Sequence, residues 1–160
     1  MAERLRRLGR YDVERLVGSG AFGAVYLGTL HGALGVRKRV ALKVIGHDRP
    51  GLDPRKIGTF VNEARLGETL HHPNIVSIHE FGQEGATFFL AMEYIDGISL
   101  RGILTLCSGR GVLLPEDAVC DLGVQVCTGL DHAHNAVTEH GHPLDLIHRD
   151  LKPSNIIVSM

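Results

Sequence analysis

The decisive stretch of this sequence is the octapeptide His148-Arg149-Asp150-Leu151-Lys152-Pro153-Ser154-Asn155, close to the end of its 160 residues. The Asp150 carboxylate can accept a proton from a hydroxyl group, and Lys152 can neutralise charge on a phosphoryl group. Asn155 offers a neutral oxygen to a hard cation such as Mg²⁺. Apolar residues on both sides, 146–147 and 156–158, predict short buried strands that hold this loop. A polar turn is the plain alternative, but few turns combine these residue types at this spacing.

The composition limits the classes of function. A hydrophobic fraction of 44% predicts a globular core, and a net charge of −1 gives no reason to expect nucleic acid or an acidic membrane surface as a partner. The three cysteines form no CxxC pair and the N-terminus is not a signal peptide, so we expect reduced thiols and a cytoplasmic location. No apolar run reaches the length of a membrane span, and the ten histidines match no metal-binding pattern.

A glycine-rich stretch follows a strand predicted over residues 11–17, with the sequence Gly18-Ser19-Gly20-Ala21-Phe22-Gly23-Ala24-Val25. Residues 24–30 are β-branched and aromatic, which predicts a second strand rather than the helix of a dinucleotide-binding fold. The pair forms a hairpin whose backbone N–H groups can approach phosphate oxygens closely. An ordinary glycine-rich turn is the alternative. The basic residues before this hairpin predict a solvated extension over 1–10.

A lysine interrupts the apolar strand predicted over residues 40–45. Burying Lys43 without a partner would be costly, although a lone strand lysine most often faces solvent. The pair Asp53-Pro54 is a good helix start, with an aspartate cap and a first-turn proline. We predict a helix from there to about Leu70, and it carries the carboxylate of Glu63.

The remaining elements follow from local pattern. A solvated basic loop is predicted over 31–39, and two further strands over 75–81 and 86–92. Helices are predicted over 99–110 and 115–134. The second is apolar nearly all round, so we expect a longer domain to bury it and this chain to leave it as an exposed apolar patch. A polar surface connection over 135–145 leads to the octapeptide.

Together these motifs resemble eukaryotic-type (Hanks-type) Ser/Thr protein kinase domains of bacterial kind, from about Tyr11 to Val158. The resemblance implies an α+β, protein-kinase-like fold. Its five-stranded antiparallel N-lobe with one helix and the hinge would span 11–95, after the extension 1–10. The first part of a mainly helical C-lobe would span 96–160. The sequence stops after the octapeptide, so we expect a fragment of a longer kinase, with little phosphotransfer by this chain alone.

The resemblance implies a role for each site residue. Asp150 and Lys152 would be catalytic, and Asn155 would bind Mg²⁺. Nucleotide would be held by the glycines of the hairpin, the lysine–glutamate pair, the gatekeeper and hinge, and the apolar residues around adenine: Val17, Gly18, Gly20, Gly23, Val25, Ala41, Lys43, Glu63, Met92, Glu93, Ile95 and Ile157. One departure is Gly67, where the family packs a larger apolar residue. There it would weaken the helix by about 1 kcal/mol relative to alanine.

The implied activity is transfer of the γ-phosphoryl group of ATP, with Mg²⁺, to Ser or Thr hydroxyls of a protein substrate. A lysine two residues after the aspartate, as at Lys152, is a feature of Ser/Thr rather than Tyr kinases. Arg149 implies control by phosphorylation of an activation segment. Two alternatives stay open: a pseudokinase-like module that binds a nucleotide or partner without catalysis, and a small-molecule phosphotransferase. The oligomeric state is open.

Overall fold

The structure is a computed structural model that describes residues 5–20, 23–46 and 53–159. It divides into two units, Met1–Glu68 with Val76–Tyr94 and Thr69–Ile75 with Ile95–Met160. Each unit is described by itself below. Among the described residues, no helix is long and apolar enough to cross a membrane.

Unit 1 is an antiparallel sheet of six strands in the order β1-β2-β3-β4-β6-β5. The strands are β1 (Arg7–Leu8), β2 (Tyr11–Gly20), β3 (Gly23–His31), β4 (Arg37–Ile45), β5 (Ile78–Glu84) and β6 (Thr87–Glu93). A short 3-10 turn, η1 (Ala33–Gly35), joins β3 to β4. The predicted strands are thus present, but the expected loop over 31–39 is wrong at both ends, because His31 belongs to β3 and 37–39 belong to β4.

The sixth strand comes from the segment that we expected to be a solvated extension, and for residues 7–10 that expectation is wrong. Leu8 is fully buried and lies in the same core cluster as Tyr11. The Gly9 N–H donates to Glu84 Oε2 of β5 at 3.2 Å, and the Arg10 Nε donates to Glu80 Oε2 at 2.8 Å. The two edge strands of the sheet are therefore bridged, and the sheet curls. Residues 1–4 lie outside the described residues.

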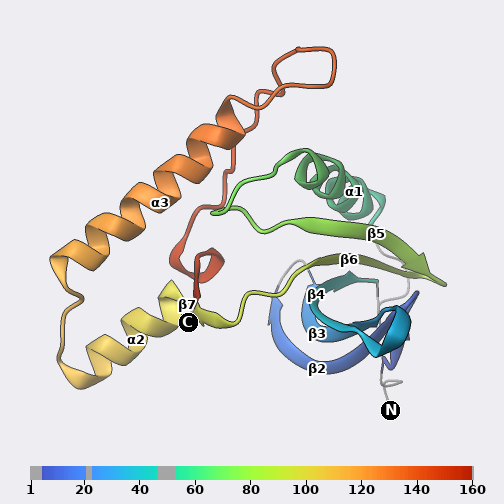
Figure 1. Cartoon of the computed structure of the whole chain (residues 1–160), viewed down its shortest axis with the longest axis horizontal. Coiled ribbons are helices and arrows are strands. Elements are labelled where there is room, and N and C mark those ends of the chain that lie inside the picture. The colour runs from blue at the N-terminus through green and yellow to red at the C-terminus, as the bar shows by residue number, and fades with distance from the viewer. Residues whose placement is uncertain (1–4, 21–22, 47–52, 160) are drawn as a thin grey trace. The chain divides into compact units, whose positions relative to one another are not determined.

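Two apolar clusters hold unit 1 together. One lies on the inner face of the curled sheet and includes Val40, Leu42 and Phe89. The other lies between the sheet and helix α1 (Pro54–Thr69), where Phe60 and Ala64 pack on Ile45 and Leu90 (Figure 1). The helix bounds match the prediction, and the Asp53 side chain accepts a hydrogen bond from the Arg55 N–H at 2.9 Å.

Gly67 has a packing reason that helix propensity did not reveal. A Cβ at this position would lie 2.1 Å from Cδ1 of Ile78 on β5. The glycine therefore lies at a close approach between β5 and α1. The expected cost to helix stability stays a prediction, and the structure adds that a larger residue would clash here.

Unit 2 contains α2 (Leu100–Arg110), α3 (Glu116–His134), the 3-10 turn η2 (Pro153–Asn155) and the pair β7 (Gly97–Ser99) and β8 (Ile157–Ser159). The Ser99 hydroxyl caps α2 by accepting from the Gly102 N–H, and Gly111 ends it at φ 64°. Acidic residues begin α3 and histidines end it, as the helix dipole favours.

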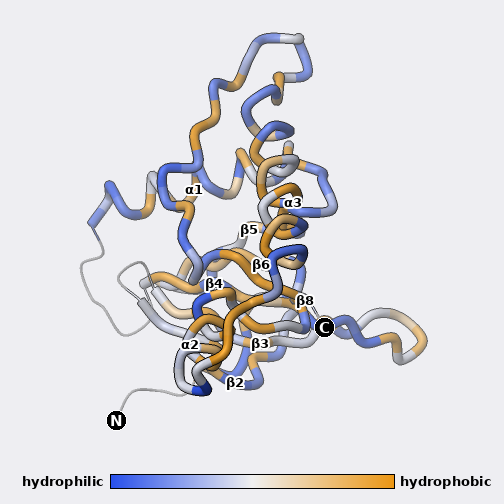
Figure 2. The backbone as a smooth tube through the Cα atoms, turned by 90° about the vertical axis from the view of Figure 1, so that its left-hand side faces the viewer, coloured by the Kyte–Doolittle hydropathy of each residue, from blue (hydrophilic) through white to orange (hydrophobic). Residues whose placement is uncertain are grey.

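Helix α3 is largely exposed within unit 2, as expected for this chain. Polar and apolar residues alternate along the helix (Figure 2), and Val119 and Val124 are 50% and 63% exposed. Only Gly129 is buried among its described residues, at the contact with the segment Thr69–Ile75. The predicted strand at 146–147 is wrong, because no described strand pairs with it and Ile147 is 65% exposed. The strand predicted over 156–158 is present as β8, but its expected burial is wrong at Ile157, which is 42% exposed.

Candidate active site

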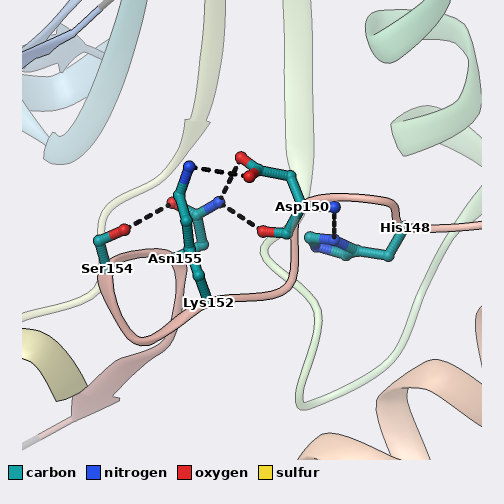
Figure 3. Close-up of polar contacts among 5 residues, drawn as sticks. All are labelled: His148, Asp150, Lys152, Ser154 and Asn155. Carbon is teal, nitrogen blue, oxygen red and sulfur yellow. Dashed lines mark hydrogen bonds and ion pairs between the residues drawn. The ribbon is translucent and has the colours of Figure 1, made fainter.

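The octapeptide forms one hydrogen-bonded cluster around Asp150 (Figure 3). The Lys152 Nζ lies 2.8 Å from Oδ1 of Asp150, and the Asn155 Nδ2 donates to Oδ2 at 2.9 Å. The same Asn155 amide nitrogen donates to the Asp150 backbone carbonyl, also at 2.9 Å. The three side chains that the sequence singled out are therefore brought together, with the carboxylate at the centre.

Local backbone geometry explains why the loop takes this shape. The residue before the aspartate, Arg149, is left-handed at φ 58°, which turns the chain sharply. The Asp150 N–H donates to the carbonyl of His148 at 2.8 Å and closes that turn. Pro153 then begins η2, where its fixed φ suits a first helical position. Strand β8 follows and pairs with β7, which anchors the far end of the loop.

These contacts favour the ionised form of the Asp150 carboxylate. The hydrogen bond from Lys152, and secondly that from Asn155, lower the pKa of Asp150 below its ordinary value. The carboxylate is solvent-exposed and remains ionised at neutral pH. It can therefore orient a hydroxyl group and accept its proton as that hydroxyl attacks.

Asn155 has an oxygen to offer a metal ion. Its amide nitrogen is committed to Asp150, which fixes the flip of the amide and turns Oδ1 outward. The Ser154 hydroxyl donates to this Oδ1 over a long distance of 3.5 Å. Within the described part of the chain, no cluster of three or more His, Cys, Asp or Glu side chains forms. A single neutral oxygen fits Mg²⁺, which keeps most of its waters, better than a metal that needs a protein cage.

In unit 1, the strand lysine finds the carboxylate of the helix. The Lys43 Nζ lies 2.6 and 2.7 Å from the two oxygens of Glu63. The Lys43 side chain is 24% exposed, so the pair gives a largely buried side chain a partner for its charge. Phe60, one turn before Glu63, places its ring 5.8 Å from the same nitrogen. Sequence reasoning missed Phe60, although its i, i+3 spacing from Glu63 could have indicated it.

The glycine-rich stretch is a hairpin, as predicted. Gly20 pairs with Gly23 across its tip, and the tip residues 21–22 lie outside the described residues. Gly23 has φ 129°, and a Cβ there would meet the Val44 carbonyl oxygen at 2.2 Å. At Gly18 and Gly20 a Cβ would meet nothing within 4 Å. Glycine is thus required by the fold at Gly23, whereas the other two leave open space beside the backbone.

Strand register arranges the other candidate residues of unit 1. Val25 pairs with Lys43, and Ala41 pairs with Met92, so the four lie in two adjacent rows of the sheet. Val17 sits at a bulge in β2 and is 49% exposed.

The last strand residue, Glu93, is held through its backbone. Its N–H donates to the carbonyl of Ser77 at 2.8 Å, so this N–H is already committed within unit 1. Sequence reasoning missed Ser77, which precedes β5 and carries no local signal.

The two remaining apolar candidates belong to unit 2 with the octapeptide. Ile95 is the first residue of unit 2 after the crossing from Tyr94. Ile157 begins β8 and is 42% exposed, directly after the loop that carries Asn155. The candidate residues therefore form two sets, a lysine–glutamate and glycine set in unit 1 and an aspartate–lysine–asparagine set in unit 2.

Comparisons with known proteins agree on one family. The sequence model of the protein kinase domain matches residues 11–160. The serine/threonine-protein kinase PrkC of Bacillus subtilis is 33% identical over 150 residues, covering 94% of this chain and 21% of PrkC. The serine/threonine-protein kinase pkn3 of Myxococcus xanthus is 39% identical over 93% of this chain and 24% of pkn3. The tyrosine-protein kinase MasK of Myxococcus xanthus is 32% identical over 97% of this chain and 24% of MasK.

A solved structure gives the same result. The crystal structure of the Mycobacterium tuberculosis PknI kinase domain is 30% identical, with a TM-score of 0.71. The match covers 99% of this chain and 60% of that chain. This chain therefore spans about a quarter or less of the curated relatives described above and just over half of the PknI kinase domain.

Proposed function

Since this chain belongs to the protein kinase domain family, we propose that the protein is a Ser/Thr protein kinase that transfers the γ-phosphoryl group of ATP to protein hydroxyls. The family generally uses ATP and Mg²⁺ and acts on proteins. The observation that carries the proposal is the Asp150 cluster, in which one carboxylate is held by both Lys152 and Asn155. The steps below describe the protein at its native length.

In unit 1, Lys43 binds the α- and β-phosphates, and Glu63 fixes the position of its ammonium group. The bidentate contact at 2.6 and 2.7 Å supports this role, because a lysine held at two oxygens loses little freedom when a phosphate arrives. The open space beside Gly18 and Gly20 lets the hairpin backbone approach phosphate oxygens. Gly23 keeps the hairpin in the shape that this approach needs.

The adenine ring would be held by apolar side chains and by backbone groups. We assign Val17, Val25, Ala41 and Ile157 to its faces and Met92 to the gatekeeper position. The carbonyl of Glu93 would accept from the adenine amino group, while its N–H stays bonded to Ser77. The backbone N–H of Ile95 would donate to the ring.

In unit 2, Asp150 orients the substrate hydroxyl and accepts its proton as the new O–P bond forms and the bond to ADP breaks. Lys152 is a cation 2.8 Å from that carboxylate and would stabilise negative charge on the phosphoryl group in transit. Asn155 would hold Mg²⁺ through Oδ1. When bound, Mg²⁺ neutralises the charge that develops on the phosphate oxygens.

We assign Ser and Thr as the acceptor residues because a lysine at the position of Lys152 is a feature of Ser/Thr kinases. The relatives PrkC and pkn3 are named serine/threonine-protein kinases, whereas MasK is named a tyrosine-protein kinase. Transfer to tyrosine is therefore the second candidate. We also propose a cytoplasmic location, which the free thiols of Cys107, Cys120 and Cys127 support.

Two measurements on the native-length protein test this function. Thermal melting with ATP, with and without Mg²⁺, reports nucleotide binding, since a bound ligand raises the melting temperature. Transfer of labelled γ-phosphate to a mixed protein substrate, followed by phosphoamino-acid analysis, reports the acceptor. We expect stabilisation by ATP and label on Ser and Thr. Stabilisation without transfer would favour the pseudokinase-like alternative, and label on Tyr alone would favour the second candidate.

A further inference from the structure

A side-chain contact lies one residue beyond the backbone pairing of β4 with β6. The last backbone pair is Val40 with Glu93, so Arg39 and Tyr94 are the next residues in register. Their side chains meet: the Arg39 guanidinium carbon lies 5.1 Å from the centre of the Tyr94 ring. This distance is within the range of a cation–π interaction.

The position of this pair relates it to the nucleotide site. Side chains alternate along a strand, so Arg39 shares one face of β4 with Ala41 and Lys43. In the proposed function, Lys43 binds the phosphates and Ala41 contacts the adenine ring. Arg39 therefore lies on the same face of β4, two residues beyond the one that contacts adenine. Its partner Tyr94 is the last residue of unit 1 before the chain crosses to Ile95.

At this crossing the backbone of Glu93 is held by the sheet, whereas Tyr94 lies beyond it. Glu93 is fixed by the strand ladder and by its N–H bond to the Ser77 carbonyl at 2.8 Å. The strand ends at Glu93, so Tyr94 is beyond the regular pairing. The guanidinium stack is one contact that extends the anchoring to this residue, one position before Ile95.

We propose that Arg39 is a positioning residue for adenine recognition. By holding the Tyr94 ring, it fixes the backbone from Glu93 to Ile95 that would read the adenine edge. The inference rests on the proposed nucleotide site. Because Arg39 is exposed, the expected effect is modest, an increase of about two- to fivefold in the Michaelis constant and dissociation constant for ATP when the stack is lost. The turnover number should not change, since Arg39 touches no reacting atom.

The variants separate this role from a general loss of charge. Arg39→Leu and Tyr94→Leu each remove the stack, and the double variant tests whether they act as one unit. Tyr94→Phe keeps the ring face and should restore wild-type affinity. Arg37→Leu is the matched control, because it removes the same charge from the same face of β4 further from Ala41.

Two inhibitors show which part of the site is affected. Adenosine reaches the hinge backbone but has no phosphates, whereas tripolyphosphate reaches Lys43 but has no base. In the native-length protein, Arg39→Leu should weaken the binding of adenosine by the same factor as the binding of ATP. The binding of tripolyphosphate should stay unchanged. The thermal melting temperature without nucleotide serves as the readout for simple destabilisation.

The outcomes are distinct. We expect Arg39→Leu, Tyr94→Leu and the double variant to lose ATP affinity by the same factor. Arg37→Leu and Tyr94→Phe should keep the ATP affinity of the wild type. Unchanged affinity in Arg39→Leu, additive losses in the double variant, or equal weakening of tripolyphosphate would overturn the inference while leaving the proposed function intact. A native protein that binds no ATP would refute the proposed function, and this inference with it.

Discussion

Substituting Gly67 by alanine gives the sharpest test of how α1 is positioned, because the same helix offers a matched control. A Cβ at Gly67 would lie 2.1 Å from Cδ1 and 2.8 Å from Cγ1 of Ile78. A Cβ at Gly58 would meet nothing within 4 Å. The two changes are chemically identical and differ only in what the new methyl group meets.

The expected magnitudes follow from two opposing effects. Replacing glycine by alanine inside a helix stabilises it by about 1 kcal/mol. Overpacking a well-filled contact costs about 1 to 3 kcal/mol. We therefore expect Gly58→Ala to raise the free energy of unfolding by about 1 kcal/mol, while Gly67→Ala leaves it unchanged or lowers it by up to about 2 kcal/mol.

Function should respond to the same displacement. Glu63 lies one turn before Gly67 on α1, and its carboxylate is 2.6 Å from the Lys43 ammonium group. If the methyl group pushes α1 away from β5, this pair loosens. A misplacement of about 1 Å in a positioning group can cost up to about 10²-fold in kcat/KM. Gly58→Ala should leave kcat/KM unchanged.

Urea denaturation and steady-state kinetics on the native-length protein measure both effects. Adding Ile78→Val to Gly67→Ala removes the Cδ1 atom that clashes, and should recover part of the stability and the kcat/KM. The reasoning is refuted if Gly67→Ala stabilises the protein as much as Gly58→Ala, or if the Ile78→Val change brings no recovery.

Three further predictions concern charged and hydroxyl groups. Glu63→Gln should lower kcat/KM by about 10- to 10²-fold, since a charge-assisted bond is worth about 1.5 to 3 kcal/mol; a wild-type rate would contradict the role of the Lys43 pair. Lys152→Met should shift the acid limb of the kcat/KM profile to higher pH, because Lys152 is the main cause of the low pKa of Asp150 and without it the carboxylate is protonated at higher pH; an unmoved limb would contradict this. Tyr11→Phe should destabilise the protein by about 1 to 2 kcal/mol, because its hydroxyl donates to a β5 carboxylate at 2.7 Å. Burial first, and that carboxylate second, raise the pKa of the hydroxyl, so its contribution is present below pH 10 and lost as the pH rises through the raised pKa; urea titrations at alkaline pH should show a steeper loss in the native protein than in Tyr11→Phe.

The sequence predicted the parts of the fold whose signal is local. The kinase fold is confirmed by the PknI structure, and the bounds of α1 and α3 match the caps and periodicity that predicted them. The cluster of Asp150, Lys152 and Asn155 could be predicted because all three lie within one short loop. The glycine hairpin also follows from the strand-forming residues on both sides of it.

The parts that could not be predicted depend on distant partners. Leu8 is one apolar residue among arginines, so it shows no periodicity, yet the core of the curled sheet buries it. Gly67 carries a propensity cost that is readable from sequence, but the close approach of Ile78 is tertiary. Ile147 belongs to an apolar pair that suggested a strand, although nothing local states whether a partner strand exists.

The most direct test of the account compares Asp150→Asn with the native-length protein in one experiment. Transfer of γ-phosphate to a protein substrate is followed in a single turnover, while ATP binding is measured separately by thermal shift. We predict that Asp150→Asn binds ATP as the wild type does but transfers phosphate at least about 10²-fold more slowly, as expected for loss of a general base. Transfer at the wild-type rate by Asp150→Asn would contradict the central claim that this carboxylate accepts the proton of the substrate hydroxyl.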